Sequence, residues 1–318
     1  MFFLSKRRRE PGWLAVSRHQ QHVEFAHVTR VTGEKPVLQR WFSEPLPGAV
    51  AGGEDPLQIC LKTFAKRREA KGFRCTTLLG EGYQFVQAEA PPVPEAEMKD
   101  ALRWKLKDLC DIPAEQAVFD ILPLPEGGST NRAQQLFLAV ANRNGVAPLA
   151  NAFHEAGLGL EAIDLPELAQ RNIAELFEDE NRGLAFLAFG ENSALLTFTF
   201  RGELFAFRRI EIGAVQIAQA SAERREQLAE RVVLEMQRSM DTVDRQFSGI
   251  SLSNMIVALP PESGLEEQFR NALYLPFEAL DLSRVMDLSA FPELRDSEAQ
   301  RRALSCIGAA LRNDEVKA

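Results

Sequence analysis

Residues 153–166 read FHEAGLGLEAIDLP, and this stretch divides the chain into two halves of similar construction. A helical pattern that starts at Gly145 ends at Gly157, because glycine readily adopts the backbone conformation that closes a helix. Residues 161–164 then begin the passage into the second half, and a new helix is predicted over 166–177. Asp164 is suited to cap that helix, and Pro166 suits its first turn, where the missing N–H is not needed.

Outward from this stretch, both halves show strands first and then an alternation of helices and strands, which predicts a mixed α/β protein with two lobes. In the first half the sequence predicts strands over 13–16, 22–31 and 76–79 and a helix over 55–72. In the second half it predicts a meander of strands over 183–189, 193–200 and 203–212, with a turn at Arg201-Gly202. Further on it predicts helices over 222–247, 264–273 and 297–312 and strands over 255–259 and 277–280.

A smaller unit interrupts the first half. Pro91-Pro92-Val93-Pro94 breaks the preceding pattern, and a helix over 95–108 follows, with its apolar side chains on one stripe. Strands are predicted over 118–124 and 135–141, joined by a polar, glycine-containing turn over 126–132. These elements predict a small α+β insertion.

Composition excludes several classes of function. The 318 residues carry a formal net charge of −8, which argues against broad nucleic-acid binding because phosphates require a cationic surface. The four cysteines form no CxxC pair and lie among apolar neighbours, which predicts buried free thiols and a reducing compartment. No apolar run approaches the roughly 20 residues of a membrane span, so the sequence predicts a cytoplasmic protein.

Four segments resemble the PilM and MshI proteins, which are actin-like proteins of type IV and MSHA pilus assembly. These segments are PGWLAVS at 11–17, ALRWKLKDLCDIPAEQAVFDILPL at 101–124, LFLAVANRNGV at 136–146 together with 153–166, and residues 183–259 with EMQRSMD at 235–241. The resemblance covers nearly the full length. It is closer to MshI, because the nucleotide motifs are eroded.

The resemblance implies a two-lobed actin-like ATPase fold of the ribonuclease H-like type, with the small α+β subdomain inserted in the first lobe. It places the first lobe at 1–160 with the insert at about 86–141. The second lobe is expected at 161–302, and residues 303–318 are expected to return to the first lobe as a helix.

In actin-like ATPases, two β-hairpins offer backbone amides to the phosphates, each with an aspartate near a glycine for the metal-bound water. Here Ala15 and Ala188 stand at the aspartate positions, and Ser17 stands at a glycine position. The loop that receives adenosine has Pro260-Pro261 in place of glycines, which removes N–H groups. The resemblance therefore implies a degenerate ATPase site with no catalytic residue and no metal ligand, and it leaves room for weak ATP binding through Gly190, Ser193 and Ser17.

The remaining candidates have simpler interpretations. His19, His22 and His27 are predicted to be solvated and to face different sides of a strand-turn-strand unit, so they form no metal site. The basic run 6–9 beside Phe2, Phe3 and Leu4 is equally consistent with a frayed end and with peripheral membrane contact.

The resemblance implies a cytoplasmic scaffold of pilus biogenesis, recruited to the cytoplasmic face of the inner membrane. Its expected partners are the cytoplasmic N-terminal tail of an inner-membrane assembly protein and the assembly ATPase, with no nucleic acid. In the family the tail docks beside the inserted subdomain, and Trp104, Leu106 and Phe119 are the candidate contacts, although core positions explain them equally well. The alternatives are a functional actin-like ATPase of the same machine and a membrane-surface adaptor that acts through residues 1–10.

Overall fold

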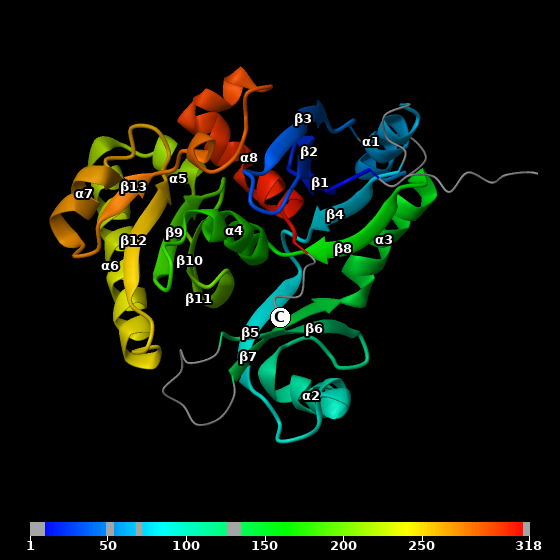
Figure 1. The fold of residues 1–318 in the computed structure, drawn as a ribbon, viewed down its shortest axis with the longest axis horizontal. Coiled ribbons are helices and arrows are strands. Elements are labelled where there is room, and N and C mark those ends of the chain that lie inside the picture. The colour runs from blue at the N-terminus through cyan, green and yellow to red at the C-terminus, as the bar shows by residue number, and fades with distance from the viewer. Residues whose placement is uncertain (1–9, 49–53, 68–71, 126–134, 314–318) are drawn as a thin grey trace, which may run out of the picture.

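A computed structural model describes residues 10–48, 54–67, 72–125 and 135–313 (Figure 1). The sheet of the first lobe contains β1 (Trp13–Arg18), β2 (His22–Thr29), β3 (Val37–Pro45), β4 (Arg74–Leu78) and β8 (Gly159–Asp164). Their order is β3-β2-β1-β4-β8, in which β1 is antiparallel to β2 and parallel to β4. The segment predicted only as a passage between the halves is thus strand β8, which pairs in parallel with β4.

Alternating side chains of this first sheet point to opposite faces and pack into two different hydrophobic cores. Leu14, Val16 and Phe25 face α1 (Pro56–Ala65) and α3 (Arg143–Ala156). Ala15 and Ala26 face the other side, where α8 (Ser297–Ala310) covers the sheet. The small side chains on this second face let the helix lie close to the strands.

The sheet of the second lobe has the order β11-β10-β9-β12-β13. Its strands are β9 (Gly183–Phe189), β10 (Ala194–Phe200), β11 (Glu203–Ile210), β12 (Leu252–Ala258) and β13 (Phe277–Ala279). The predicted meander and its turn at Arg201-Gly202 are confirmed, and the hairpin phenylalanines Phe198 and Phe205 are core residues. One face of the sheet packs against α6 (Ala222–Gln246) and α7 (Leu265–Ala272), and the other packs against α4 (Pro166–Ala174).

The two lobes share a core at the α4–α8 pair. The cluster that contains Ala15 and Ala26 of the first sheet also contains Phe186 and Ile256 of the second. Helix α4 packs on the second sheet and helix α8 packs on the first, and the two helices pack against each other between the lobes. Asp164 does not cap α4, because the N-cap is Leu165; the Asp164 carboxylate instead accepts the Leu165 N–H at 3.0 Å.

The insert comprises β5 (Tyr83–Glu89), α2 (Glu95–Leu109), β6 (Ala117–Pro123) and β7 (Gln135–Asn142), with an antiparallel sheet of order β5-β7-β6. Strands β3 and β5 were not predicted, and the predicted turn over 126–132 lies outside the described residues, as does the basic run 6–9. The remaining short elements are α5 (Ala214–Ala218), η2 (Glu175–Phe177), η3 (Leu282–Arg284) and η4 (Pro292–Arg295).

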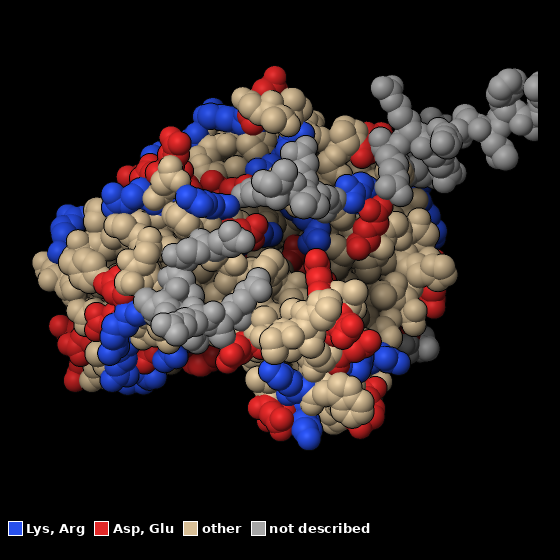
Figure 2. Space-filling model, turned by 60° about the horizontal axis from the view of Figure 1, so that its bottom comes forward, with Lys and Arg blue, Asp and Glu red and all other residues tan. Residues whose placement is uncertain are grey.

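The prediction of buried free thiols is confirmed for three of the four cysteines. Cys60, Cys75 and Cys306 are buried free thiols, and Cys110 is partly exposed. Among the helices of the described residues, none is long and apolar enough to span a membrane. On the face in Figure 2, basic and acidic side chains of the described residues are interspersed and form no broad basic patch.

Candidate functional site

The first of the two hairpins expected at the phosphates, β1–β2, lies directly beneath α8. Ala15 has no exposed surface, and the Cys306 thiol of α8 donates to the Ala15 carbonyl at 3.7 Å and to the Glu24 carbonyl at 3.5 Å. Ser17 is also buried and pairs with Glu24 across the hairpin. An aspartate at position 15 would therefore place its carboxylate in a space that the helix already fills.

A polar cluster occupies the open end of this hairpin. The buried Glu24 carboxylate accepts the Trp41 indole N–H at 2.5 Å and lies 3.5 Å from His19 Nε2. His19 stacks on His22 with 4.4 Å between ring centroids, and burial together with His19 lowers the pKa of His22. The prediction of solvated histidines is wrong for His27, which is 4% exposed.

The environment of His27 favours the neutral form of its ring. Its Nε2 lies 2.9 Å from the Pro11 carbonyl, and its ring meets the edge of Phe73 at 4.7 Å. Burial lowers the pKa of His27, more than the Pro11 hydrogen bond raises it. Among the residues that the structure describes, no three metal-binding side chains converge.

The second hairpin expected at the phosphates, β9–β10, is closed by the start of α5. The Gly190 N–H donates to the Ser193 carbonyl at 2.9 Å, and the Gly190 and Glu191 carbonyls accept the N–H groups of Ala214 and Val215 at 2.9 and 3.1 Å. This contact requires glycine at position 213, where a Cβ would lie 2.2 Å from the Glu191 carbonyl oxygen. Gly190 and Ser193 thus form one tight turn, and Ser17 lies on the other hairpin.

A buried arginine of α8 reaches the end of the second hairpin. Arg301 is 9% exposed and donates to the Phe189 carbonyl, while its Nε and Nη2 each donate to Glu298 at 2.6 Å. Burial alone would raise the pKa of Glu298, but the hydrogen bonds from Arg301 and Arg302 lower it overall. Helix α8 therefore contacts both hairpins, through Arg301 at the Phe189 carbonyl and through Cys306 at the Ala15 and Glu24 carbonyls.

Sequence reasoning did not find this pair. Its signal is the spacing of Glu298 to Arg301 and Arg302, which places both cations within reach of one carboxylate on a helix. Such spacing is common on solvated helices, and only the return of α8 to the hairpins brings this pair beside Phe189.

The loop expected to receive adenosine is held by its own chain. Arg225 of α6 donates to the Glu262 carbonyl at 3.1 Å, and the Ser263 hydroxyl accepts the Leu265 N–H at 3.4 Å. Glu262 has a left-handed backbone with φ of 51°. Pro260 and Pro261 offer no N–H to a ligand.

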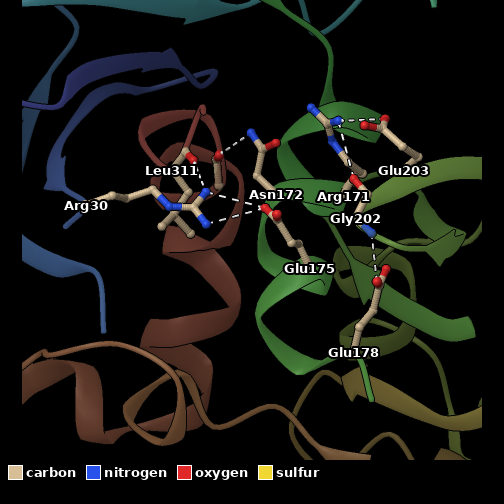
Figure 3. Close-up of polar contacts among 9 residues, drawn as sticks. Arg30, Arg171, Asn172, Glu175, Glu178, Gly202, Glu203 and Leu311 are labelled. Atoms are coloured by element: carbon tan, nitrogen blue, oxygen red, sulfur yellow. Dashed lines mark hydrogen bonds and ion pairs between the residues drawn. The ribbon is translucent and has the colours of Figure 1, made fainter. Parts of the chain in front are cut away.

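Polar contacts across the α4–α8 junction tie the lobes together (Figure 3). Asn172 donates to the Gly308 carbonyl at 2.9 Å, and Arg30, the residue after β2, donates to the Leu311 carbonyl at 3.0 Å and to Glu175 at 3.4 Å. On the other side of α4, Arg171 donates to Glu203 at 3.1 Å, and Glu178 accepts the Gly202 N–H at 2.7 Å. The side chains of the protein itself therefore bridge the lobes.

The insert is joined to the second lobe through a partly buried triad of side chains. The Tyr83 hydroxyl of β5 donates to Glu167 of α4 at 2.7 Å, and Arg209 of β11 donates to Glu167 at 2.8 Å and to the Tyr83 oxygen at 2.6 Å. Glu167 is 1% exposed, so both partners are needed to offset the cost of its burial. Burial and the Glu167 charge raise the pKa of Tyr83.

The candidate partner-binding residues of the insert fall into two groups. Leu106 is fully buried and Phe119 is 8% exposed, and both belong to the core between α2 and the small sheet. Trp104, on the same helix, is 81% exposed. Of the three side chains, only that of Trp104 is exposed on the surface.

Comparison with known proteins defines the class of fold. No family model matches the chain, and no curated protein matches it. A solved structure described as the PilM–PilN type IV pilus biogenesis complex is similar over 95% of this chain and 98% of that chain, with a TM-score of 0.71 and 20% identity. A protein of actin-like ATPase fold and unknown function from Bacteroides thetaiotaomicron matches 93% of this chain and 99% of its own, with a TM-score of 0.50 and 8% identity. The chain therefore has the actin-like ATPase fold.

Proposed function

We propose that the protein is a scaffold of type IV pilus biogenesis, of the MshI-like kind, that acts at the cytoplasmic face of the inner membrane. The observation that carries this proposal is the likeness to the PilM–PilN complex over almost the whole length of both chains, insert included. The scaffold would bind the cytoplasmic tail of an inner-membrane assembly protein and link it to the assembly ATPase. Exposed Trp104 is the candidate contact on the insert.

We further propose that the protein neither hydrolyses ATP nor binds Mg-ATP tightly. Ala15 and Ala188 supply no carboxylate for a metal-bound water, and Arg301 lies against the end of the second hairpin. Asn172 of α4 bonds to Gly308 of α8, and Arg30 bonds to Leu311 and Glu175, so side chains of the protein itself join the lobes.

Calorimetry with Mg-ATP tests the nucleotide proposal. We expect no binding by the wild-type protein and none by Arg301→Ala, because removal of the arginine creates space but supplies no metal ligand. Micromolar binding by the wild-type protein would overturn the proposal. Binding by Arg301→Ala alone would show that the arginine, rather than the missing carboxylates, excludes the nucleotide.

Co-purification with the cytoplasmic tail of the inner-membrane protein encoded beside this chain tests the scaffold role. We expect the wild-type protein to retain the tail and Trp104→Ala to retain less of it. Leu109→Ala, on the same helix but packed against the insert core, is the control for a disturbed insert. Absence of binding at physiological salt would contradict the scaffold role.

A further inference from the structure

A hollow of about 380 Å³ lies between the insert and the second lobe. Its insert wall is formed by Phe85, Gln87 and Phe137, and its other wall comes from β10, β11 and α6. In Figure 1 the small sheet lies below β11, and ring contacts of Phe207 with Phe85 at 5.1 Å and with Phe137 at 5.8 Å join the two. The volume falls within the roughly 300–1,000 Å³ of ordinary ligand pockets.

The edge of a sheet borders this hollow. Strand β11 is the outer strand of the second sheet, and among the described strands it pairs only with β10. Ala206, Phe207 and Arg208, in the middle of β11, line the hollow. An outer strand presents backbone N–H and C=O groups that an extended segment of another protein can pair with.

The two sides of such an added strand would meet different surfaces. Successive side chains of a strand point to opposite faces. One set would lie over Ser239, Thr242 and Val243 of α6, and the other would face Phe85 and Phe137 of the insert. The aromatic insert wall favours large apolar side chains at alternate positions of the segment.

The charge at the rim specifies a further property of the segment. Arg208 and Arg238 line the hollow and are 54% and 63% exposed, and no acidic side chain of the described residues lines it. Both arginines share a single carboxylate, Glu235, at 2.6 and 3.3 Å, so among the described side chains two positive charges meet one negative charge. An acidic residue of the segment would complement these arginines.

We propose that this hollow, named the β11 groove, binds an extended segment of a partner protein as an additional strand along β11. The segment carries large apolar side chains at alternate positions and at least one Asp or Glu beside them. The inference rests on the proposed scaffold function and deepens it, because it adds a docking site on the second lobe, separate from Trp104 on the outer side of the insert.

The probe is a random peptide library of about ten residues displayed on phage, long enough to supply one strand. Selection uses the full chain, and the enriched peptides are synthesised with a fluorescent label for anisotropy titrations. We expect enriched sequences with apolar residues at alternate positions and an acidic residue. Absence of that pattern from the enriched peptides would overturn the proposal.

Variants of α6 locate the binding site. Thr242→Trp fills the groove from an exposed helical position and should weaken peptide binding at least about tenfold. Gln227→Trp, also exposed on α6 but about 22 Å away along the helix, should leave binding unchanged. Equal affinity for the wild-type protein and Thr242→Trp would contradict the proposal.

Two further measurements separate strand addition from other binding. Arg238→Glu should weaken binding of the acidic peptide, and a peptide with Lys in place of its acid should regain affinity for that variant. Backbone amides of β11 should exchange more slowly with solvent when the peptide is bound, and protection confined to other elements would refute strand addition.

The scaffold role and the groove fail in different ways. In one outcome, the inner-membrane tail and the library peptides each bind the wild-type protein and Thr242→Trp with equal affinity. That result would support the scaffold role and refute the β11 groove. If library peptides bind the groove but the tail does not bind at all, the β11 groove stands and the pilus assignment fails.

Discussion

Substitution of Gly308 by alanine should destabilise the protein, although alanine is the better helix former. Gly308 lies on α8 where that helix crosses α4, and a Cβ there would stand 2.3 Å from the Ala169 carbonyl oxygen and 2.8 Å from its carbon. Carbon atoms in contact normally lie about 3.5–4.0 Å apart, so the helices must separate by about 1 Å. That movement also strains the Asn172 hydrogen bond to the Gly308 carbonyl.

The sizes of three opposing effects decide whether Gly308→Ala stabilises or destabilises the protein. Exchange of glycine for alanine inside a helix favours folding by about 1 kcal/mol. Overpacking of a close contact costs about 1–3 kcal/mol, and loss of a buried hydrogen bond costs about 1 kcal/mol more. We therefore expect Gly308→Ala to lower the free energy of unfolding by about 2 kcal/mol.

The assay is urea unfolding followed by tryptophan fluorescence. Trp13 and Trp41 are both packed in the first lobe, which α8 covers, so their signal reports on the affected core. Gly145→Ala is the matched control, because Gly145 lies on α3 and a Cβ at that position would meet no other atom of the described residues within 4 Å. We expect this control substitution to be stabilising by about 0.5–1 kcal/mol. A Gly308→Ala protein as stable as the wild type would refute the steric reasoning.

Three other changes test the site and its surroundings. The pKa of His27 is lower in the folded protein than in the unfolded chain, so its contribution to stability is present above about pH 6.5 and is lost as the pH falls. The variant His27→Gln keeps a hydrogen-bond donor but does not titrate. It should therefore flatten the pH dependence of the urea unfolding midpoint between about pH 7.5 and 5.5. An unchanged slope in that variant would contradict the assignment. Trp104→Ala should alter stability by less than about 0.5 kcal/mol, whereas Leu106→Ala should cost about 2–5 kcal/mol, and thermal melts that show equal losses would be inconsistent with the burial described. Tyr83→Phe removes one hydrogen-bond partner of Glu167 and should lower the free energy of unfolding in urea by about 1–3 kcal/mol. It should also speed proteolysis between the insert and the lobes. No change in either measurement would show that the triad does not hold the insert.

The elements with strong local patterns could be predicted from the sequence. The stripe of α6 and the alternation of β9, β10 and β11 with a turn at Gly202 contain their own signals, and the structure agrees to within a residue or two. Strand β3 was missed because its burial is irregular and most of its side chains are only partly covered. Strand β8 was missed for a related reason, since it lies at the edge of its sheet.

The site was less predictable than the fold, because it depends on contacts distant in sequence. Ala15 and Ala188 can be identified as missing carboxylates from their place in the hairpins. Arg301 could not be placed against Phe189, 112 residues away in the chain, without knowledge that α8 returns to the first sheet. His27 likewise lies on a strand whose alternation is unclear, and only the packing of Phe73 explains its burial.

The position of α8 also has a consequence for how the protein is made. The first sheet is complete once β8 at residues 159–164 has left the ribosome, but one of its faces is covered only by residues 297–310. The strands and helices of the second lobe between Gly183 and Ala279 are contiguous and can pack as soon as they are synthesised. During the intervening translation, Ala15, Ala26 and Val28 would remain exposed as an apolar surface. The nascent chain is therefore expected to depend on chaperones over this interval, and substitutions in α8 would reduce the yield of folded protein more than its measured stability suggests.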